Sequence, residues 1–273
     1  MIKNLFDVSE KVIVITGGGG VLGGNMAKYL LENKATVVIL DYSEEIVHAT
    51  ITKLKKTSSN VAGFVCNVLD EENLQKTTDE IISQFGKVDV LINAAGGNMP
   101  GATIGEHQNI FDVKIDDFKK VVDLNLFGSI LPSLAIGKEM AKNKKGVIIN
   151  ISSMTAQSAI TRVVGYSASK AAIDNYTKWL SVELATKFGD GMRVNAIAPG
   201  FFIGNQNRDL LINKTDGSYT DRGNTIIQNT PMKRFGETSE LNGSIHYLCS
   251  DASKFVTGIV VPIDGGFSAF SGV

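Results

Sequence analysis

The chain has 273 residues, of which 43% are hydrophobic and 20% are charged, and its formal net charge at pH 7 is −1. This length and composition suit one large α/β domain with an ample core. The near-zero charge argues against a nucleic-acid or anionic-membrane partner, because such partners usually select for a basic excess.

The cysteines and histidines also exclude a metal centre at this stage. Cys66 and Cys249 lie far apart, and the three histidines form no cluster with metal-ligand spacing, so two buried free thiols are expected. The segment 1–10 has charged residues and no apolar core, so no signal peptide is predicted. Later apolar runs are expected to be too short or too interrupted to span a bilayer, which makes a cytoplasmic protein the expectation.

Predicted strands and helices alternate from the start of the chain. Residues 11–16 form a β-branched run that ends in four glycines, residues 25–33 have a helical pattern, and residues 36–40 form an apolar run that ends at Asp41. Further strands are predicted at 61–66, 88–92, 146–151, 193–197 and 259–263, and further helices at 71–85, 118–139, 166–188 and 239–249. Runs that are apolar on both faces are typical of buried parallel strands. The alternation therefore predicts a Rossmann-like α/β fold, a doubly wound parallel sheet in a three-layer α/β/α domain spanning residues 1–273.

Two polar segments interrupt this alternation, at about 97–116 and 201–234. Both follow strand ends at the edge where doubly wound sheets bind their ligands. Long irregular loops in a compact domain are usually lids or binding loops. We therefore expect these two segments to select the substrate.

A glycine-rich loop follows the first strand and opens a helix. Within it, Gly18, Gly20 and Gly23 have the spacing of the general dinucleotide motif. A pyrophosphate can approach the N–H groups of a helix N-terminus there because no Cβ atom obstructs it. Asp41 lies 18 residues after Gly23, an interval at which an acid binds the adenosine ribose and repels a 2′-phosphate. This predicts NAD(H) rather than NADP(H), against the alternatives of a ligand-free turn and a solvent-facing aspartate.

Tyr166 and Lys170 lie four residues apart at the start of a predicted helix, so they share one face. A nearby ammonium favours the phenolate and lowers the pKa of a tyrosine, which can then exchange a proton with an alcohol or carbonyl oxygen. Ser153 closes the fifth strand, 13 residues before Tyr166, where its hydroxyl can hold a substrate oxygen. Asn125 on a mostly apolar helix either caps a local bend or holds a water that passes protons from Lys170.

Together with Asn93-Ala94-Ala95-Gly96 and Pro199-Gly200, these residues resemble the motif set of the short-chain dehydrogenase/reductase family over residues 11–267. The resemblance implies that Tyr166 is the acid/base, that Ser153 polarises the substrate oxygen and that Asn125 belongs to a proton relay. It implies that the cofactor is bound by Gly17, Gly19, Gly20, Leu22, Gly23, Asp41, Asn67, Val68, Asn93, Ala94, Ala95, Tyr166, Lys170, Pro199 and Gly200.

The chain departs from the family pattern at two positions. Val21 stands where the family motif has its middle glycine, so that Gly20 is expected to take this role. Asn67 stands where an aspartate is frequent, near the adenine, and its amide can still form a hydrogen bond there. Because members of the family are commonly tetramers, the resemblance also implies a homotetramer.

Amides and arginines are frequent in the predicted substrate loops, and arginine suits a carboxylate through paired hydrogen bonds. Arg162, four residues before Tyr166, is the first carboxylate candidate and Arg208 the second, although either can instead form a surface salt bridge. The residues predicted to contact substrate are Asn98, Ser153, Arg162, Gln206 and Arg208.

The loop sequences are similar to those of family members that interconvert D-mannonate and D-fructuronate with NAD(H), which implies a small sugar-acid substrate. Two alternatives remain open. One is a reductase of another ketone, such as 5-keto-gluconate or a 3-oxoacyl thioester, although an acyl-carrier partner would require a basic docking patch. The other is a catalytically silent NAD-sensing protein.

Overall fold

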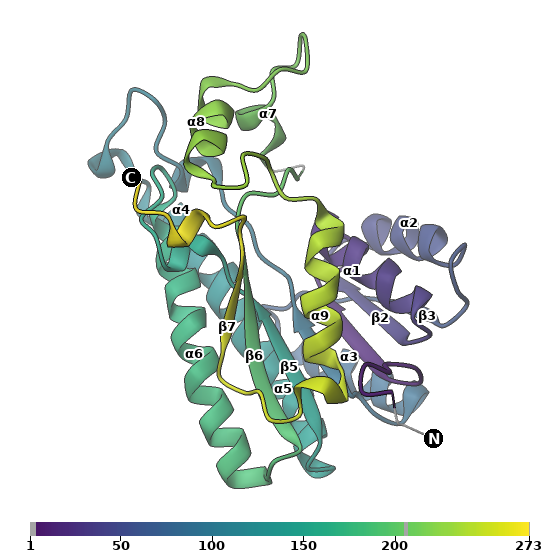
Figure 1. The fold of residues 1–273 in the computed structure, drawn as a ribbon. Coiled ribbons are helices and arrows are strands. Elements are labelled where there is room, and N and C mark those ends of the chain that lie inside the picture. Colours follow the sequence, from purple (N-terminus) through teal and green to yellow (C-terminus); the bar gives the residue numbers. More distant parts are fainter. Residues whose placement is uncertain (1–3, 205–206, 273) are drawn as a thin grey trace.

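A computed structural model describes residues 4–204 and 207–272, and it contains one parallel sheet of seven strands (Figure 1). The strands are β1 (Val12–Thr16), β2 (Thr36–Asp41), β3 (Val61–Val65), β4 (Val90–Asn93), β5 (Gly146–Ile151), β6 (Met192–Pro199) and β7 (Val260–Ile263). Their order across the sheet is β3-β2-β1-β4-β5-β6-β7, so the winding direction changes between β1 and β4. The predicted doubly wound parallel sheet is confirmed.

Helices cover both faces of this sheet. The principal ones are α1 (Val21–Glu32), α2 (Glu44–Leu54), α3 (Glu71–Phe85), α4 (Ile115–Val122), α5 (Gly128–Lys142), α6 (Val164–Phe188) and α9 (Asn242–Cys249). One buried cluster joins the sheet to α1, α2 and α9, and a second joins it to α3, α5 and α6. Strand β1 supplies Ile13 and Ile15 to the first cluster and Val12 and Val14 to the second. This two-sided burial explains why its sequence is apolar throughout.

The helix predicted at 118–139 extends from Ile115 to Lys142 and contains a π-helical turn at Asp123–Phe127. By length and composition alone this run is apolar enough to cross a membrane, with a mean hydropathy of 1.2 in its most apolar 18-residue window. However, 44% of that window is buried inside the protein, and α5 supplies Ile136 and Met140 to the core. A helix at the centre of an α/β fold has the same composition for that reason.

The second predicted loop is partly helical. It contains α7 (Arg208–Leu211) and α8 (Asp221–Asn229), which rise above the carboxyl edge of the sheet in Figure 1. Leu211, Ile226 and Phe235 pack together as a small core of their own. We call residues 207–236 the cap. Its structure places side chains over the strand ends without making them part of the sheet.

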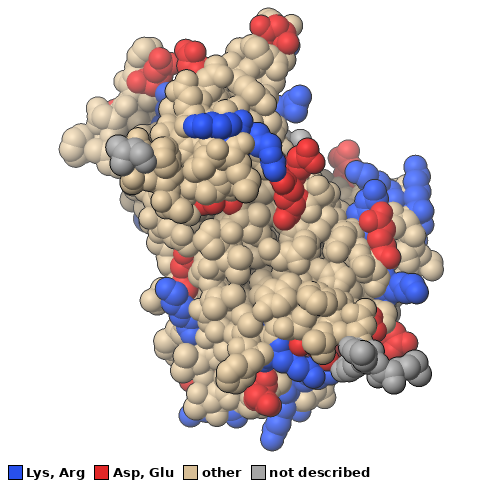
Figure 2. All heavy atoms as spheres, viewed as in Figure 1, with Lys and Arg blue, Asp and Glu red and all other residues tan. Residues whose placement is uncertain are grey.

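Charged side chains of both signs are interspersed on the face drawn in Figure 2. A broad uncharged area lies between them, over β6, β7 and α9. This distribution agrees with the small net charge of the chain.

Candidate active site

The two candidate hydroxyl groups meet beside the carboxyl end of β5. Ser153 follows this strand and is the N-cap of a short 3₁₀ turn, where its Oγ accepts a hydrogen bond from the Thr155 N–H at 3.3 Å. Tyr166 lies in the first turn of α6, and its hydroxyl forms a hydrogen bond with Ser153. The topology therefore brings together two groups that are 13 residues apart in the chain, and both can contact one substrate oxygen.

Burial controls the acidity of Tyr166. It raises the pKa of the phenol above its ordinary value, and the hydrogen bond with Ser153 opposes this rise. The expected lowering by Lys170 is therefore not the dominant effect. The reason is geometric, since the Lys170 ammonium lies over the tyrosine ring, with Nζ 5.4 Å from the ring centroid. In this arrangement Tyr166 is predominantly a neutral proton donor.

Lys170 is a buried cation, with 3% of its surface exposed. Its Nζ donates a hydrogen bond to the Ile151 carbonyl oxygen at 2.7 Å. Burial lowers the pKa of Lys170 to about 8, and the nearby Asp174 carboxylate opposes that shift. Asp174 lies one helical turn further along α6 and accepts a hydrogen bond from the Ser152 hydroxyl. Sequence reasoning missed Ser152 and Asp174, although a four-residue spacing on the same helix was a usable signal for the aspartate.

Asn125 lies in the π-helical turn and is completely buried. Its Nδ2 donates to the carbonyl oxygens of Val121 at 2.8 Å and Gly97 at 2.6 Å, and its Oδ1 accepts from the Gly97 N–H at 3.1 Å. A Cβ added at Gly96 would lie 2.7 Å from this Oδ1 and 3.4 Å from Lys170 Nζ. Asn125 thus stabilises the bend and holds the first substrate loop beside Lys170. The proton relay stays a prediction.

The glycine loop closes tightly over the end of β1. Gly17 has a φ of +61°, and a Cβ added there would lie 2.8 Å from the Ala95 Cα. A Cβ at Gly23 would lie 2.6 Å from the Gly17 carbonyl oxygen, so both positions require glycine. Gly20 is the N-cap of α1, while Leu22 is partly buried against the core and Val21 points outward. Gly20 therefore occupies the exposed position of the turn.

The N-terminus of α1 is suited to an anion. Helices α2 and α3 begin with capping side chains, Ser43 and Asp70, followed by two glutamates each. Helix α1 has neither a capping side chain nor an acidic residue in its first turn. Its N–H groups are thus available to a pyrophosphate, and the surrounding glycines leave room for it.

Asp41 ends β2 next to this loop and is buried. One carboxylate oxygen accepts from the Gly19 N–H at 3.1 Å, and the other accepts from the Tyr42 N–H at 2.9 Å. Asn67 is exposed after β3, and Val68 is buried beneath it, against Gly128. The acid, the amide and the glycine loop lie at neighbouring strand ends, as a dinucleotide requires.

The residues after β4 and β6 close the same edge of the sheet. The Thr16 hydroxyl accepts from the N–H groups of Ala94 and Ala95, each at 3.1 Å. Asn93 is buried and donates to Ser133 and Asn150, so its side chain links the sheet to α5 rather than lining the cleft. Pro199 ends β6, and a Cβ at Gly200 would lie 2.6 Å from the Asp264 Cα.

The residues predicted to contact substrate differ in their burial and in their contacts. Arg162 lies directly before α6 and is partly buried, and Asn98 in the first loop donates to the Thr103 hydroxyl at 2.8 Å. Arg208 is exposed at the start of α7. Gln206 lies outside the described residues. A further arginine, Arg222 in the cap, donates a hydrogen bond to the hydroxyl of Thr161, the neighbour of Arg162, at 3.4 Å. Sequence reasoning missed it because no spacing relates the two residues.

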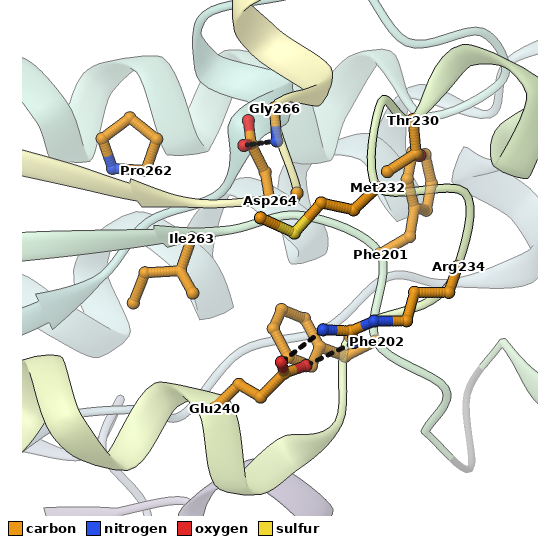
Figure 3. A pocket seen from close by; sticks show the side chains of 12 residues that line it. Phe201, Phe202, Thr230, Met232, Arg234, Glu240, Pro262, Ile263, Asp264 and Gly266 are labelled. Carbon is orange, nitrogen blue, oxygen red and sulfur yellow. Dashed lines mark hydrogen bonds and ion pairs between the residues drawn. The ribbon is translucent and has the colours of Figure 1, made fainter.

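A pocket of about 390 Å³ lies on the β7 side of β6 (Figure 3). Phe201, Phe202 and Met232 form its apolar wall, and Arg234 and Glu240 form an ion pair of 2.6 Å across it. Its lining does not include Tyr166, Ser153 or Lys170. The pocket therefore adjoins the Pro199-Gly200 end of the cleft and is separate from the hydroxyl pair.

The known proteins reported below are similar to this chain over nearly its whole length. Residues 20–268 match a family model described as Enoyl-(Acyl carrier protein) reductase, which represents short-chain dehydrogenases/reductases. An uncharacterized oxidoreductase, UxuB, of Bacillus subtilis is 44% identical over 98% of both chains. A 2-dehydro-3-deoxy-D-gluconate 5-dehydrogenase of Formosa agariphila is 33% identical over 100% of this chain and 98% of its own. A Haemophilus influenzae structure with bound NAD, described as a candidate D-mannonate oxidoreductase, has a TM-score of 0.90 and 42% identity, covering 99% of this chain and 100% of that one.

Proposed function

The chain belongs to the short-chain dehydrogenase/reductase family of oxidoreductases, and we propose that within this family it interconverts D-mannonate and D-fructuronate with NAD(H). The observation that carries the proposal is the similarity over nearly the whole chain to the NAD-bound structure described as a candidate D-mannonate oxidoreductase. The partly buried Arg162, four residues before Tyr166 in the loop that leads into α6, supports an acidic substrate.

The cofactor supported by this site is NAD(H). The α1 N-terminus and the glycine loop would hold the pyrophosphate, and the Asp41 carboxylate would accept hydrogen bonds from the adenosine ribose. NAD(H) bound there would supply hydride transfer to or from the carbon that bears the substrate oxygen.

The protein's own residues manage the proton and the substrate oxygen. Ser153 Oγ holds the oxygen by a hydrogen bond, and Tyr166 Oη donates a proton to it when the ketone is reduced. Donation leaves a phenolate, and the nearby Lys170 ammonium stabilises its negative charge. In the reverse direction this phenolate accepts the proton of the substrate hydroxyl and becomes a neutral phenol again. A tyrosine beside a buried cation is thus suited to moving one proton in either direction.

The test is NADH consumption by the purified protein with a panel of ketones. The panel contains D-fructuronate, 5-keto-D-gluconate and a 3-oxoacyl thioester, because the matching family model is named for acyl-carrier substrates. We expect D-fructuronate to give the highest kcat/KM. A higher value with the thioester would replace the sugar-acid proposal. NADH binding without turnover of any ketone would favour the silent sensor.

Cofactor choice gives a separate prediction at Asp41. Asp41→Asn keeps an acceptor for the Gly19 N–H and removes the charge that repels a 2′-phosphate. We expect the preference for NADH over NADPH to fall by about 10- to 100-fold, the equivalent of one charged hydrogen bond and its repulsion. Steady-state kcat/KM values for both cofactors measure this ratio. An unchanged ratio would mean that Asp41 only supports the loop.

A homotetramer is part of the proposal. Leu134 of α5 and Trp179 and Val182 of α6 are exposed by 57%, 62% and 66%, and large apolar side chains of this kind are typical of subunit interfaces. We expect light scattering to report four times the chain mass of 29.3 kDa. A monomer mass at micromolar concentration would contradict this prediction.

A further inference from the structure

The five arginines of the chain differ in how their charges are compensated. Arg193 donates to the carbonyl oxygens of Leu248, Ser250 and Val256, and Arg234 is paired with Glu240. Within 4–204 and 207–272, no carboxylate lies within ion-pair distance of Arg162 or Arg222. Each of these two residues is partly buried, so each side chain has lost some of its solvation without gaining an anion.

These two arginines, which come from two different loops, lie near enough for their charges to interact. Arg222 Nη1 donates to the hydroxyl of Thr161, the residue next to Arg162, at 3.4 Å. Burial lowers the pKa of Arg222, and the positive charge of Arg162 lowers it further. Two like charges at such a place repel each other unless an anion lies between them.

Three segments fix this arrangement, namely the loop before α6, the first substrate loop and the cap. Arg162 has a φ of +78°, a conformation that side-chain-bearing residues rarely adopt, and its carbonyl oxygen accepts from the Ile104 N–H at 2.9 Å. Arg222 is positioned by the small core of the cap, where a Cβ at Gly223 would lie 2.6 Å from the Leu211 carbonyl oxygen. Strained backbone of this kind is concentrated at ligand sites. The two cations are therefore held in place by loops that also border the active site.

We propose that Arg162 and Arg222 together bind the carboxylate of the substrate, one from the loop before α6 and one from the cap. The proposal rests on the proposed function, in that it takes the substrate to be a sugar acid. In D-fructuronate the carboxylate and the keto carbon lie several bonds apart along one chain. The carboxylate bound by the arginines would thus direct the keto oxygen toward Ser153 and Tyr166. Arg208, exposed on α7, has no part in this subsite.

The first experiment compares Arg162→Gln, Arg222→Gln and Arg222→Lys with wild type in NADH oxidation. The control is Lys214→Gln, which removes an exposed positive charge of the cap that is paired with Asp209 at 2.8 Å. We expect each Gln variant to raise the KM for D-fructuronate by about 10- to 100-fold, the loss of hydrogen bonds to a charged group. The KM of Arg222→Lys should lie between those of wild type and Arg222→Gln, because lysine keeps the positive charge but lacks the planar guanidinium group. D-Fructose carries a hydroxymethyl group in place of the carboxylate, so the Gln variants should reduce it at the same rate as wild type does.

A second experiment measures ligand binding at the proposed carboxylate site without turnover. In the presence of NADH, calorimetric titration should show that wild type binds D-mannonate more tightly than D-mannitol, and that both Gln variants lose this difference. If D-fructuronate is not reduced but the D-mannonate preference depends on both arginines, the proposed reaction fails and the anion site stands. If the Gln variants bind D-mannonate as wild type does, with unchanged thermal unfolding, the arginine subsite is overturned.

Discussion

Replacing Tyr166 with Phe is expected to lower kcat/KM for the ketone by about 10²- to 10⁴-fold, because it removes the phenolic proton donor beside Ser153 and keeps the ring. The ring over which Lys170 lies is retained, so the shape of the site should be preserved. NADH binding, measured by fluorescence titration, should be unchanged.

Tyr176→Phe is the matched control. Tyr176 lies on the same helix but packs against the second buried cluster, and burial raises its pKa to about 12. This variant should turn over substrate as wild type does. Equal activity of the two variants would remove Tyr166 from the acid/base role.

Lys170→Met should separate activity from stability. The folded-state pKa of Lys170 is about 8, below its ordinary value of 10.5, so protonation of this group opposes folding. This destabilisation of the folded state is fully present below pH 8 and disappears as the pH rises toward 10.5. It amounts to about 3 kcal/mol at neutral pH. Methionine keeps most of the side-chain volume without the charge.

We therefore expect the free energy of unfolding of wild type to rise by about 3 kcal/mol relative to Lys170→Met between pH 8 and pH 10.5. At neutral pH the variant should be as stable as wild type, since the lost bond to Ile151 is offset by the removed charge. Its kcat should fall by about 10²-fold or more. Urea titrations at several pH values measure the first effect. Lys187→Met, an exposed charge on the same helix, is the control. Parallel stability profiles for wild type and Lys170→Met would contradict the assignment.

The sheet was predictable because its central strands are buried on both faces. Residues such as Ile13 and Val14 point to opposite helix layers, and both sides are apolar, so the sequence needs no long-range information to reveal the strand. The glycine loop was predictable for a similar reason, since its close approaches at Gly17 and Gly23 tolerate no side chain. Helix α2 was not predicted. Only Val47 and Leu54 of its residues are buried, and two apolar positions give a weak periodic pattern.

The sequence was sufficient to predict most residues of the site, but not the direction in which the pKa of Tyr166 shifts. Tyr166 and Lys170 share a helix face by spacing alone, but the direction of the phenol pKa depends on how burial compares with a charge over the ring. The π-helical turn around Asn125 leaves no periodic signature, so its hydrogen bonds to Gly97 emerge only in three dimensions. Arg222 was missed for the same reason, because its neighbour Thr161 lies in a distant segment of the chain.

The cap has one further consequence. Leu211, Ile226 and Phe235 pack on one another, whereas the sheet is stabilised by its own two apolar layers. Amino-acid substitutions on the side of the cap that faces the strand ends can therefore accumulate during evolution. They would not disturb the strands that position Ser153 and Tyr166. The residues that carry out the chemical step and the cap that contributes to substrate choice can in this way change independently. A grafted cap should alter which ketone is reduced while the transferred proton keeps the same donor.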